Sequence, residues 1–193
     1  MKSTIPLAER LRPTSLDDYI GQKHIIGEHA VLRRAIESGR IPSMIFWGPP
    51  GVGKTTLAYI ISKQVKRQFF QLSAVSSGVK EVREVIDRAR MLPESPILFI
   101  DEIHRFSKSQ QDSLLGAVEK GLVTLIGATT ENPSFEVISP LLSRCQVYVL
   151  KSLEKEDLAV MLEKAVKVLE YDYGKPIVVH SARDDWTGTP CIA

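Results

Sequence analysis

The sequence is poor in cysteine, since only Cys145 and Cys191 occur among 193 residues. Their spacing matches neither a structural zinc motif nor the disulfide framework of a small secreted domain. The chain also lacks any apolar run that approaches the roughly 20 residues a membrane-spanning helix needs. Residues 1–13 lack the apolar centre of a signal peptide. We therefore expect a soluble, cytoplasmic protein without a membrane partner.

A strong net charge is absent as well, because 25 basic residues nearly balance 23 acidic ones and leave a formal charge of +2. A global basic field that attracts nucleic acid is excluded, so any such contact must come from local clusters. Basic residues flank two predicted helices, at Lys63, Lys66, Arg67, Lys80, Arg83, Arg88 and Arg90. Solvated charged faces explain these clusters about as well as DNA contacts do.

Hydrophobic residues make up 44% of the chain, enough for the core of one α/β domain and part of a second. The apolar pattern predicts strands over residues 43–47, 68–73, 96–100, 122–127 and 146–150, and helices over 53–66, 79–91, 107–119 and 134–143. The third and fourth strands are largely apolar, which is typical of strands covered on both faces. This order predicts a three-layer α/β sandwich around a five-stranded parallel sheet.

The same pattern divides the chain into four parts. Residues 1–27 form a polar N-terminal arm, and residues 28–151 form the core. An amphipathic helix over 154–169 lies in a third part, residues 152–170, and predicts the start of a further element. Residues 171–193 form a tail whose Gly, Pro and Asp content suits an exposed segment.

One segment fills every fixed position of the phosphate-loop pattern G-x-x-x-x-G-K-[ST]. It lies between an apolar strand and a helix, so phosphates would meet a helix N-terminus. Its glycines let the backbone turn N–H groups toward an anion, Lys54 neutralises phosphate charge, and the Thr55 hydroxyl can ligate Mg²⁺. The predicted nucleotide-binding residues are Gly48, Pro49, Pro50, Gly51, Val52, Gly53, Lys54, Thr55 and Thr56. A chance turn before a helix is a poor alternative, and we expect ATP with Mg²⁺ as the cofactors.

Two carboxylates, Asp101 and Glu102, follow the predicted strand 96–100 directly. Open α/β sheets keep their ligand chemistry at the carboxyl ends of strands. Asp101 suits the outer shell of a Mg²⁺ ion held with Thr55, and Glu102 can orient or deprotonate the water that attacks the γ-phosphate. The pair thus predicts hydrolysis rather than binding alone.

Hydroxyl groups end the next predicted strand, where a polar side chain can hydrogen-bond the γ-phosphate or the attacking water. Thr130 is the preferred candidate, with Thr129 and Asn132 close behind. A β-branched strand end with an Asx turn is the alternative.

An arginine, Arg144, lies between the predicted helix 134–143 and the last strand. It can act as an arginine finger that stabilises charge at a neighbouring subunit's γ-phosphate. By itself, an arginine at a helix C-terminus is more often solvated or placed to complement the helix dipole.

Taken together, these motifs closely resemble the replication-associated recombination protein A family of AAA+ ATPases, over about residues 4–170. The segments that carry the resemblance are 6–13 (PLAERLRP), 21–22 (GQ), the phosphate loop, 101–106 (DEIHRF), 127–135 (GATTENPSF) and 143–145 (SRC). The resemblance implies an AAA+ core with Asp101 and Glu102 as the Walker B pair, Thr130 as sensor 1 and Arg144 as arginine finger. It also implies that an adenine-side region includes Arg12, Pro13, Ile20, Gly21 and Gln22.

For partners, the resemblance implies forked or single-stranded DNA, single-stranded-DNA-binding protein and a homo-oligomer, with a place near the nucleoid. The family continues into a helical lid with a second-sensor arginine and a C-terminal oligomerisation domain. Arg183 lies outside that lid pattern, so we expect an incomplete lid, a truncated or frame-shifted tail, weak ATP binding and slow hydrolysis.

Three other functions stay open at this point. A RuvB-like branch-migration ATPase shares the GATT strand end, but usually lacks the SRC triplet. A nucleotide-gated binding module would assemble with full-length partners without efficient turnover of its own, and mixing with a complete family member would show whether Arg144 stimulates or poisons turnover. A small-molecule kinase would need an acceptor pocket and seldom carries a pair such as Asp101 and Glu102.

Overall fold

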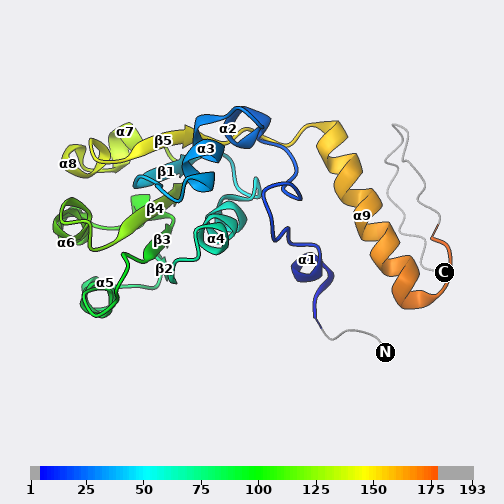
Figure 1. Cartoon of the computed structure of the whole chain (residues 1–193). Helices are drawn as coiled ribbons and strands as arrows, with labels where there is room; N and C mark the ends of the chain where they lie inside the picture. Colours follow the sequence, from blue (N-terminus) through cyan, green and yellow to red (C-terminus); the bar gives the residue numbers. More distant parts are fainter. Residues whose placement is uncertain (1–4, 178–193) are drawn as a thin grey trace.

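Five parallel strands form the centre of the molecule (Figure 1), in the order β2-β3-β4-β1-β5. The computed structural model describes residues 5–177. The strands are β1 (Met44–Trp47), β2 (Phe69–Ser73), β3 (Ile97–Asp101), β4 (Thr124–Thr129) and β5 (Gln146–Val149). The predicted five-stranded parallel sheet is confirmed.

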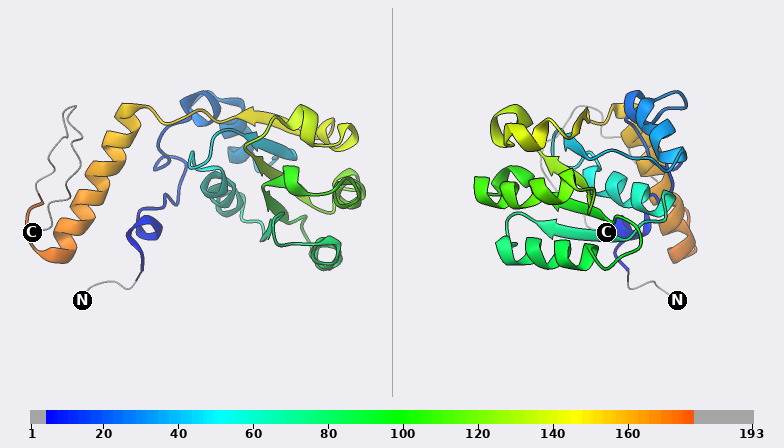
Figure 2. Two further views of the ribbon diagram at one scale, coloured as in Figure 1. Left: turned by 180° about the vertical axis from the view of Figure 1, so that it is seen from behind. Right: turned by 60° about the vertical axis from the view of Figure 1, so that its left-hand side comes forward.

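Helices connect and cover these strands. They are α1 (Leu7–Arg10), α2 (Lys23–Ile26), α3 (Val31–Glu37), α4 (Lys54–Gln64), α5 (Val79–Ala89), α6 (Lys108–Glu119), α7 (Pro133–Glu136), α8 (Ser139–Leu142) and α9 (Lys155–Tyr173), with a 3₁₀ turn η1 (Ile103–Arg105). Figure 1 shows α5, α6 and α8 along one side of the sheet and α4 on the other, and Figure 2 shows the same layers from two further directions. Parallel strands need such crossovers, because a tight hairpin cannot join them.

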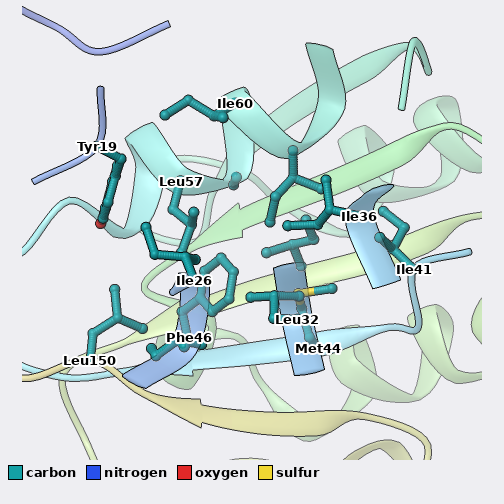
Figure 3. Packing of buried hydrophobic residues seen from close by; sticks show 14 of the residues in the cluster. Tyr19, Ile26, Leu32, Ile36, Ile41, Met44, Phe46, Leu57, Ile60 and Leu150 are labelled. Carbon is teal, nitrogen blue, oxygen red and sulfur yellow. The ribbon is translucent and has the colours of Figure 1, made fainter. Parts of the chain in front are cut away.

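The alternation of side chains along each strand divides the core into two. On one face, Met44 and Phe46 of β1 pack with α2, α3 and α4 residues, among them Leu32 and Leu57 (Figure 3). On the other face, Ile45 of the same strand belongs to the cluster formed with α5 and α6. Successive strand residues point to opposite faces, so one short apolar strand supplies both cores.

The prediction of one helix over 134–143 was wrong. The chain forms two four-residue helices, α7 and α8, with extended backbone at Val137 and Ile138 between them. Pro140 has no N–H to continue a helix from α7. The Gln111 side chain of α6 provides hydrogen-bond partners for the backbone on both sides of this break. Its NH₂ group donates to the Glu136 carbonyl at 3.0 Å, and its side-chain oxygen accepts from the Ile138 N–H at 2.9 Å.

Two other boundaries moved for local reasons. The fourth strand begins at Thr124 instead of residue 122, because Leu122 still donates its N–H to the Ala117 carbonyl and so completes the end of α6. Gly121, with φ of +65°, permits this left-handed helix end. The last helix extends beyond residue 169 to Tyr173, where Gly174 ends it in the same conformation.

Helix α9 stands apart from the sheet in Figures 1 and 2, and none of its residues is buried. A side-chain ion pair between Arg10 of α1 and Asp172 joins its far end to the N-terminal arm. No helix within the described residues is long and apolar enough to cross a membrane. Arg183, which does not fit the lid pattern of a second sensor, lies outside the described residues.

A buried and an exposed phenylalanine allow a direct test of the core packing. Phe99 is fully buried and stacks on Phe69 with ring centroids 5.9 Å apart, whereas Phe135 is 84% exposed. Replacing a buried Phe with Ala costs about 3–5 kcal/mol, so Phe99→Ala should lower the free energy of unfolding in urea by that amount. The matched Phe135→Ala variant should change it by less than about 0.5 kcal/mol. Equal effects of the two substitutions would contradict this packing.

Candidate nucleotide-binding site

The phosphate-loop segment lies between the end of β1 and the start of α4, at the carboxyl edge of the sheet. Gly51 and Gly53 take φ values of +78° and +93°, which a side chain rarely tolerates. Gly48 donates its N–H to the Thr129 carbonyl at 3.2 Å, so the loop is fastened to the end of β4. A Cβ at Gly48 would lie 2.2 Å from the Leu150 carbonyl oxygen, which excludes any larger residue there.

Tyr19, in the N-terminal arm, contacts the phosphate loop. Its hydroxyl donates to the Val52 carbonyl at 3.0 Å, and a Cβ at Gly53 would come within 2.5 Å of that hydroxyl. Burial raises the pKa of Tyr19, so the hydroxyl keeps the proton that it donates. Sequence reasoning missed this residue. Only its place in the arm, two residues before Gly21, could have suggested it.

The Lys54 side chain is buried and folds back on its own loop. Its ammonium donates to the carbonyls of Gly48 and Pro49, both at 2.8 Å. Burial lowers the Lys54 pKa, while the nearby carboxylates of Glu102 and Asp101 act in the opposite direction. A cation held among carbonyls next to two carboxylates can neutralise an incoming phosphate.

Helix α4 begins at Lys54, and its N-cap residue Gly53 provides no side-chain cap. Its first N–H groups therefore have no capping side chain, and the helix dipole favours an anion at that position. Thr55 and Thr56 follow in the first turn and are half-buried. These features fit the phosphates of a nucleotide.

Asp101 ends β3, and Glu102 follows it with a left-handed backbone, φ of +55°. Asp101 pairs in register with Ser73 of β2. The Glu102 carboxylate lies 3.3 Å from Nε2 of His104 in η1. Among residues 5–177, no group of three or more His, Cys, Asp or Glu could hold a metal by itself. A Thr hydroxyl and an Asp carboxylate suit Mg²⁺, which usually keeps few protein ligands besides water and phosphate.

The three hydroxyl and amide candidates at the end of β4 have different surroundings. Thr129 is fully buried, and its hydroxyl contacts Nδ1 of His104 at 3.0 Å and accepts the Glu131 N–H at 3.0 Å. The Asn132 side chain accepts from the Ser134 N–H and caps α7. Thr130 lies between them and is half-buried. The internal bonds of its two neighbours favour Thr130 as the ligand-facing side chain.

Arg144 lies on the surface after α8, with its side chain 41% exposed. It pairs with Glu119, at the end of α6, with 2.5 Å between Nη2 and Oε1, and donates to the Pro140 carbonyl at 2.7 Å. An exposed pair of this kind contributes about 0–1 kcal/mol. The guanidinium can therefore exchange this partner for another anion at little cost.

The predicted adenine-side residues of the arm occupy varied surroundings. Arg12 is exposed and pairs with Glu9 at 3.0 Å, and Pro13 and Ile20 are half-buried. Gln22 is buried, and its side chain binds both backbone groups of Lys151, at 2.7 and 2.9 Å. This clamp joins the arm to the segment between β5 and α9.

The basic clusters divide into structural and exposed residues. Arg67 donates to the Ser95 carbonyl at 2.5 Å and to the Thr124 hydroxyl at 2.7 Å, so it braces the sheet. Arg83, Arg90 and Lys120 line a shallow groove between α5 and α6. Arg67, one of the basic residues that flank the predicted helices, therefore has a structural role in the sheet.

Comparisons with known proteins agree with this geometry. The model of the family described as "ATPase family associated with various cellular activities (AAA)" matches residues 44–153. Replication-associated recombination protein A of Haemophilus influenzae is 56% identical over 173 residues, 88% of this chain and 39% of that protein. The protein of the same name from Escherichia coli K12 is 52% identical, over 90% of this chain and 40% of its own length. The resemblance predicted from the motifs is confirmed.

More distant relatives extend the same result. The ATPase WRNIP1 of Dictyostelium discoideum is 49% identical over 86% of this chain and 19% of its own length. Among solved structures, the RuvB Holliday junction branch migration motor of Thermotoga maritima superposes with a TM-score of 0.70 at 32% identity, covering 83% of this chain and 55% of that one. The chain thus spans about two fifths of the length of its bacterial recombination-protein relatives.

The contact between the arm and the loop can be tested by removing one oxygen atom. Tyr19→Phe deletes the donor to Val52 and leaves a buried carbonyl without its partner, so the free energy of unfolding should fall by about 1 kcal/mol. Tyr171→Phe, at a position 88% exposed, is the matched control and should leave stability unchanged. Unfolding in urea measures both, and a Tyr19→Phe variant as stable as wild type would show that the hydrogen bond contributes nothing.

Proposed function

The chain belongs to the AAA family of ATPases, and we propose that it binds ATP with Mg²⁺ and hydrolyses it in the service of DNA replication, recombination and repair at stalled forks. One observation carries the proposal. The buried Lys54 ammonium, held by the loop carbonyls, lies close enough to Glu102 and Asp101 for both carboxylates to affect its pKa. The cation that can neutralise phosphate charge and the carboxylates that can activate water thereby lie at one edge of the sheet.

In this proposal the site residues have separate roles. The loop residues 48–56 bind the phosphates, and Thr55 with Asp101 would hold Mg²⁺, which when bound neutralises phosphate charge. Glu102 orients the attacking water, and Thr130 contacts the γ-phosphate. Arg12, Pro13, Ile20 and Gln22 would lie on the adenine side, where the buried Gln22 clamp supports a structural part for that side chain.

The partners and assembly that we propose rest on the resemblance to the same family. We propose that the chain acts as a homo-oligomer on forked or single-stranded DNA together with single-stranded-DNA-binding protein, in the cytoplasm beside the nucleoid. The names of its relatives support a role in replication-associated recombination. The exposed Arg83, Arg90 and Lys120 are the basic residues best placed for a DNA phosphate contact.

Binding and hydrolysis can be separated by two substitutions. Lys54→Ala should abolish ATP binding, because it removes the cation from the phosphate loop. Glu102→Gln should keep binding and lower kcat at least about 100-fold, because an amide cannot accept the water's proton. Isothermal titration with ATP and a phosphate-release assay measure the two effects. Glu131→Gln, at a nearby exposed residue, should change neither. Turnover that survives Glu102→Gln would overturn the proposed role of this carboxylate.

If Arg144 acts as an arginine finger between subunits, the turnover rate should depend on protein concentration. Arg144 would complete a neighbour's site, so the isolated chain should hydrolyse ATP slowly and the rate per chain should rise with concentration. Arg144→Ala should remove this rise, with a loss of up to about 10³-fold, whereas Arg34→Ala at an exposed position of α3 should not.

A mixing experiment sharpens this test. Glu102→Gln and Arg144→Ala chains are both inactive alone, but a mixed pair contains one intact Glu102 opposite one intact Arg144. Turnover should therefore reappear on mixing. Its absence would refute a finger acting between subunits, and ATP binding without turnover at any concentration would favour a nucleotide-binding module.

A further inference from the structure

His104 lies between Glu102 and the end of β4 and contacts both. Its Nε2 is 3.3 Å from the Glu102 carboxylate, and its Nδ1 is 3.0 Å from the Thr129 hydroxyl. The His104 side chain is 13% exposed and that of Glu102 is 29% exposed, so water screens the contact only partly. Neither the phosphate loop nor the sheet hydrogen bonds require a histidine at this position.

The hydrogens along this chain of contacts can be assigned from valence. An ionised carboxylate only accepts, so the Nε2 that faces Glu102 carries the hydrogen. In a neutral ring Nδ1 is then an acceptor, and the Thr129 hydroxyl, which also lies 3.2 Å from the Glu131 carbonyl, donates to the closer Nδ1 at 3.0 Å. The Glu131 N–H in turn donates to the Thr129 oxygen at 3.0 Å. In this assignment every donor meets an acceptor, and the series links the end of β4 to Glu102.

The two ends of the series differ in burial and in backbone support. Thr129 is fully buried, and its strand pairs with β1 on one side and with β3 on the other. Glu102 lies outside the strand, in a left-handed backbone conformation that is uncommon for a residue with a side chain. Nε2 of His104 lies 3.3 Å from this carboxylate and can support it where the strand does not.

We propose that His104 is a positioning residue that fixes the Glu102 carboxylate relative to strand β4 through Thr129. The proposal rests on the proposed hydrolysis, since it concerns the carboxylate that orients the water. Thr130, the residue proposed to contact the γ-phosphate, is next to Thr129 in the chain. A shift of this strand end is therefore transmitted through His104 to Glu102, which links the occupant of the phosphate site to the position of the water-activating group.

Two amide substitutions divide the contacts of the ring. Gln places an amide near the position of Nε2 and can still donate to Glu102, whereas Asn reaches only the position of Nδ1. His104→Asn and His104→Ala should lower kcat about 10- to 100-fold, as misplacement of a reacting group does. His104→Gln keeps the Glu102 end but loses the Thr129 contact, so it should lower kcat as Thr129→Val does, and the ATP dissociation constant should change less than about twofold in all three.

The Thr129 end of this hydrogen-bond series can be tested with a matched pair of substitutions. Thr129→Val keeps the shape but removes the hydroxyl, and should lower kcat as His104→Asn does. Thr129→Ser keeps the hydroxyl and should behave as wild type. Combining Thr129→Val with His104→Asn should add little to either alone, because both break one connection. His29→Ala, at an exposed histidine before α3, is the control. Thermal unfolding identifies any variant that is merely unstable.

A readout independent of turnover comes from ¹⁵N NMR of the histidine side chains in the 193-residue chain. Neutral His104 should show the tautomer with hydrogen on Nε2, and Thr129→Val should shift its Nδ1 resonance. The opposite tautomer, or a kcat unchanged in stable His104→Ala, overturns the positioning role. Absence of any Glu102-dependent turnover in wild type overturns the proposed function instead, and the tautomer then still decides whether the contact exists.

Discussion

Parallel pairing of β1, β3 and β4 is the constraint on which the rest of the structure depends. Because all three strands run the same way, their carboxyl ends meet at one edge of the sheet. The phosphate loop follows β1, the Asp101 and Glu102 pair follows β3, and Thr130 follows β4. Residues separated by some 80 positions thereby lie at the same edge of the sheet.

This arrangement requires helices on both faces, and the two buried clusters are its energetic counterpart. The crossovers that parallel strands need are the same helices that bury Phe46 on one face and Ile45 on the other. A buried polar group in such a core must be paired. Lys54 meets this requirement through the carbonyls of its own loop, and Gln111 meets it by satisfying the break between α7 and α8.

Polar clamps supplement apolar packing outside the sheet, where Leu16, Tyr19, Ile25 and Ile26 of the arm are buried in the core. Tyr19 holds the arm against the phosphate loop, Gln22 joins the arm to the segment before α9, and Arg10 reaches the far end of that helix. Helix α9 buries none of its residues. A helix attached by a few hydrogen bonds can shift more readily than one that shares a core, and the arm, which does share the core, connects the nucleotide loop to α9.

The sequence by itself determined the alternation of strands and helices, the phosphate loop and the carboxylates after the third strand, because local patterns and short motifs encode these features directly. It failed at residues 134–143, where the apolar spacing predicts a helix but Pro140 and the distant Gln111 decide for two. Only the tertiary structure decided that Thr129 contacts His104, that Gln22 clamps Lys151 and that Tyr19 supports Val52. Each of these contacts joins residues 25 or more positions apart. Such pairs leave no period or spacing in a sequence, since chain folding alone brings them within hydrogen-bond distance.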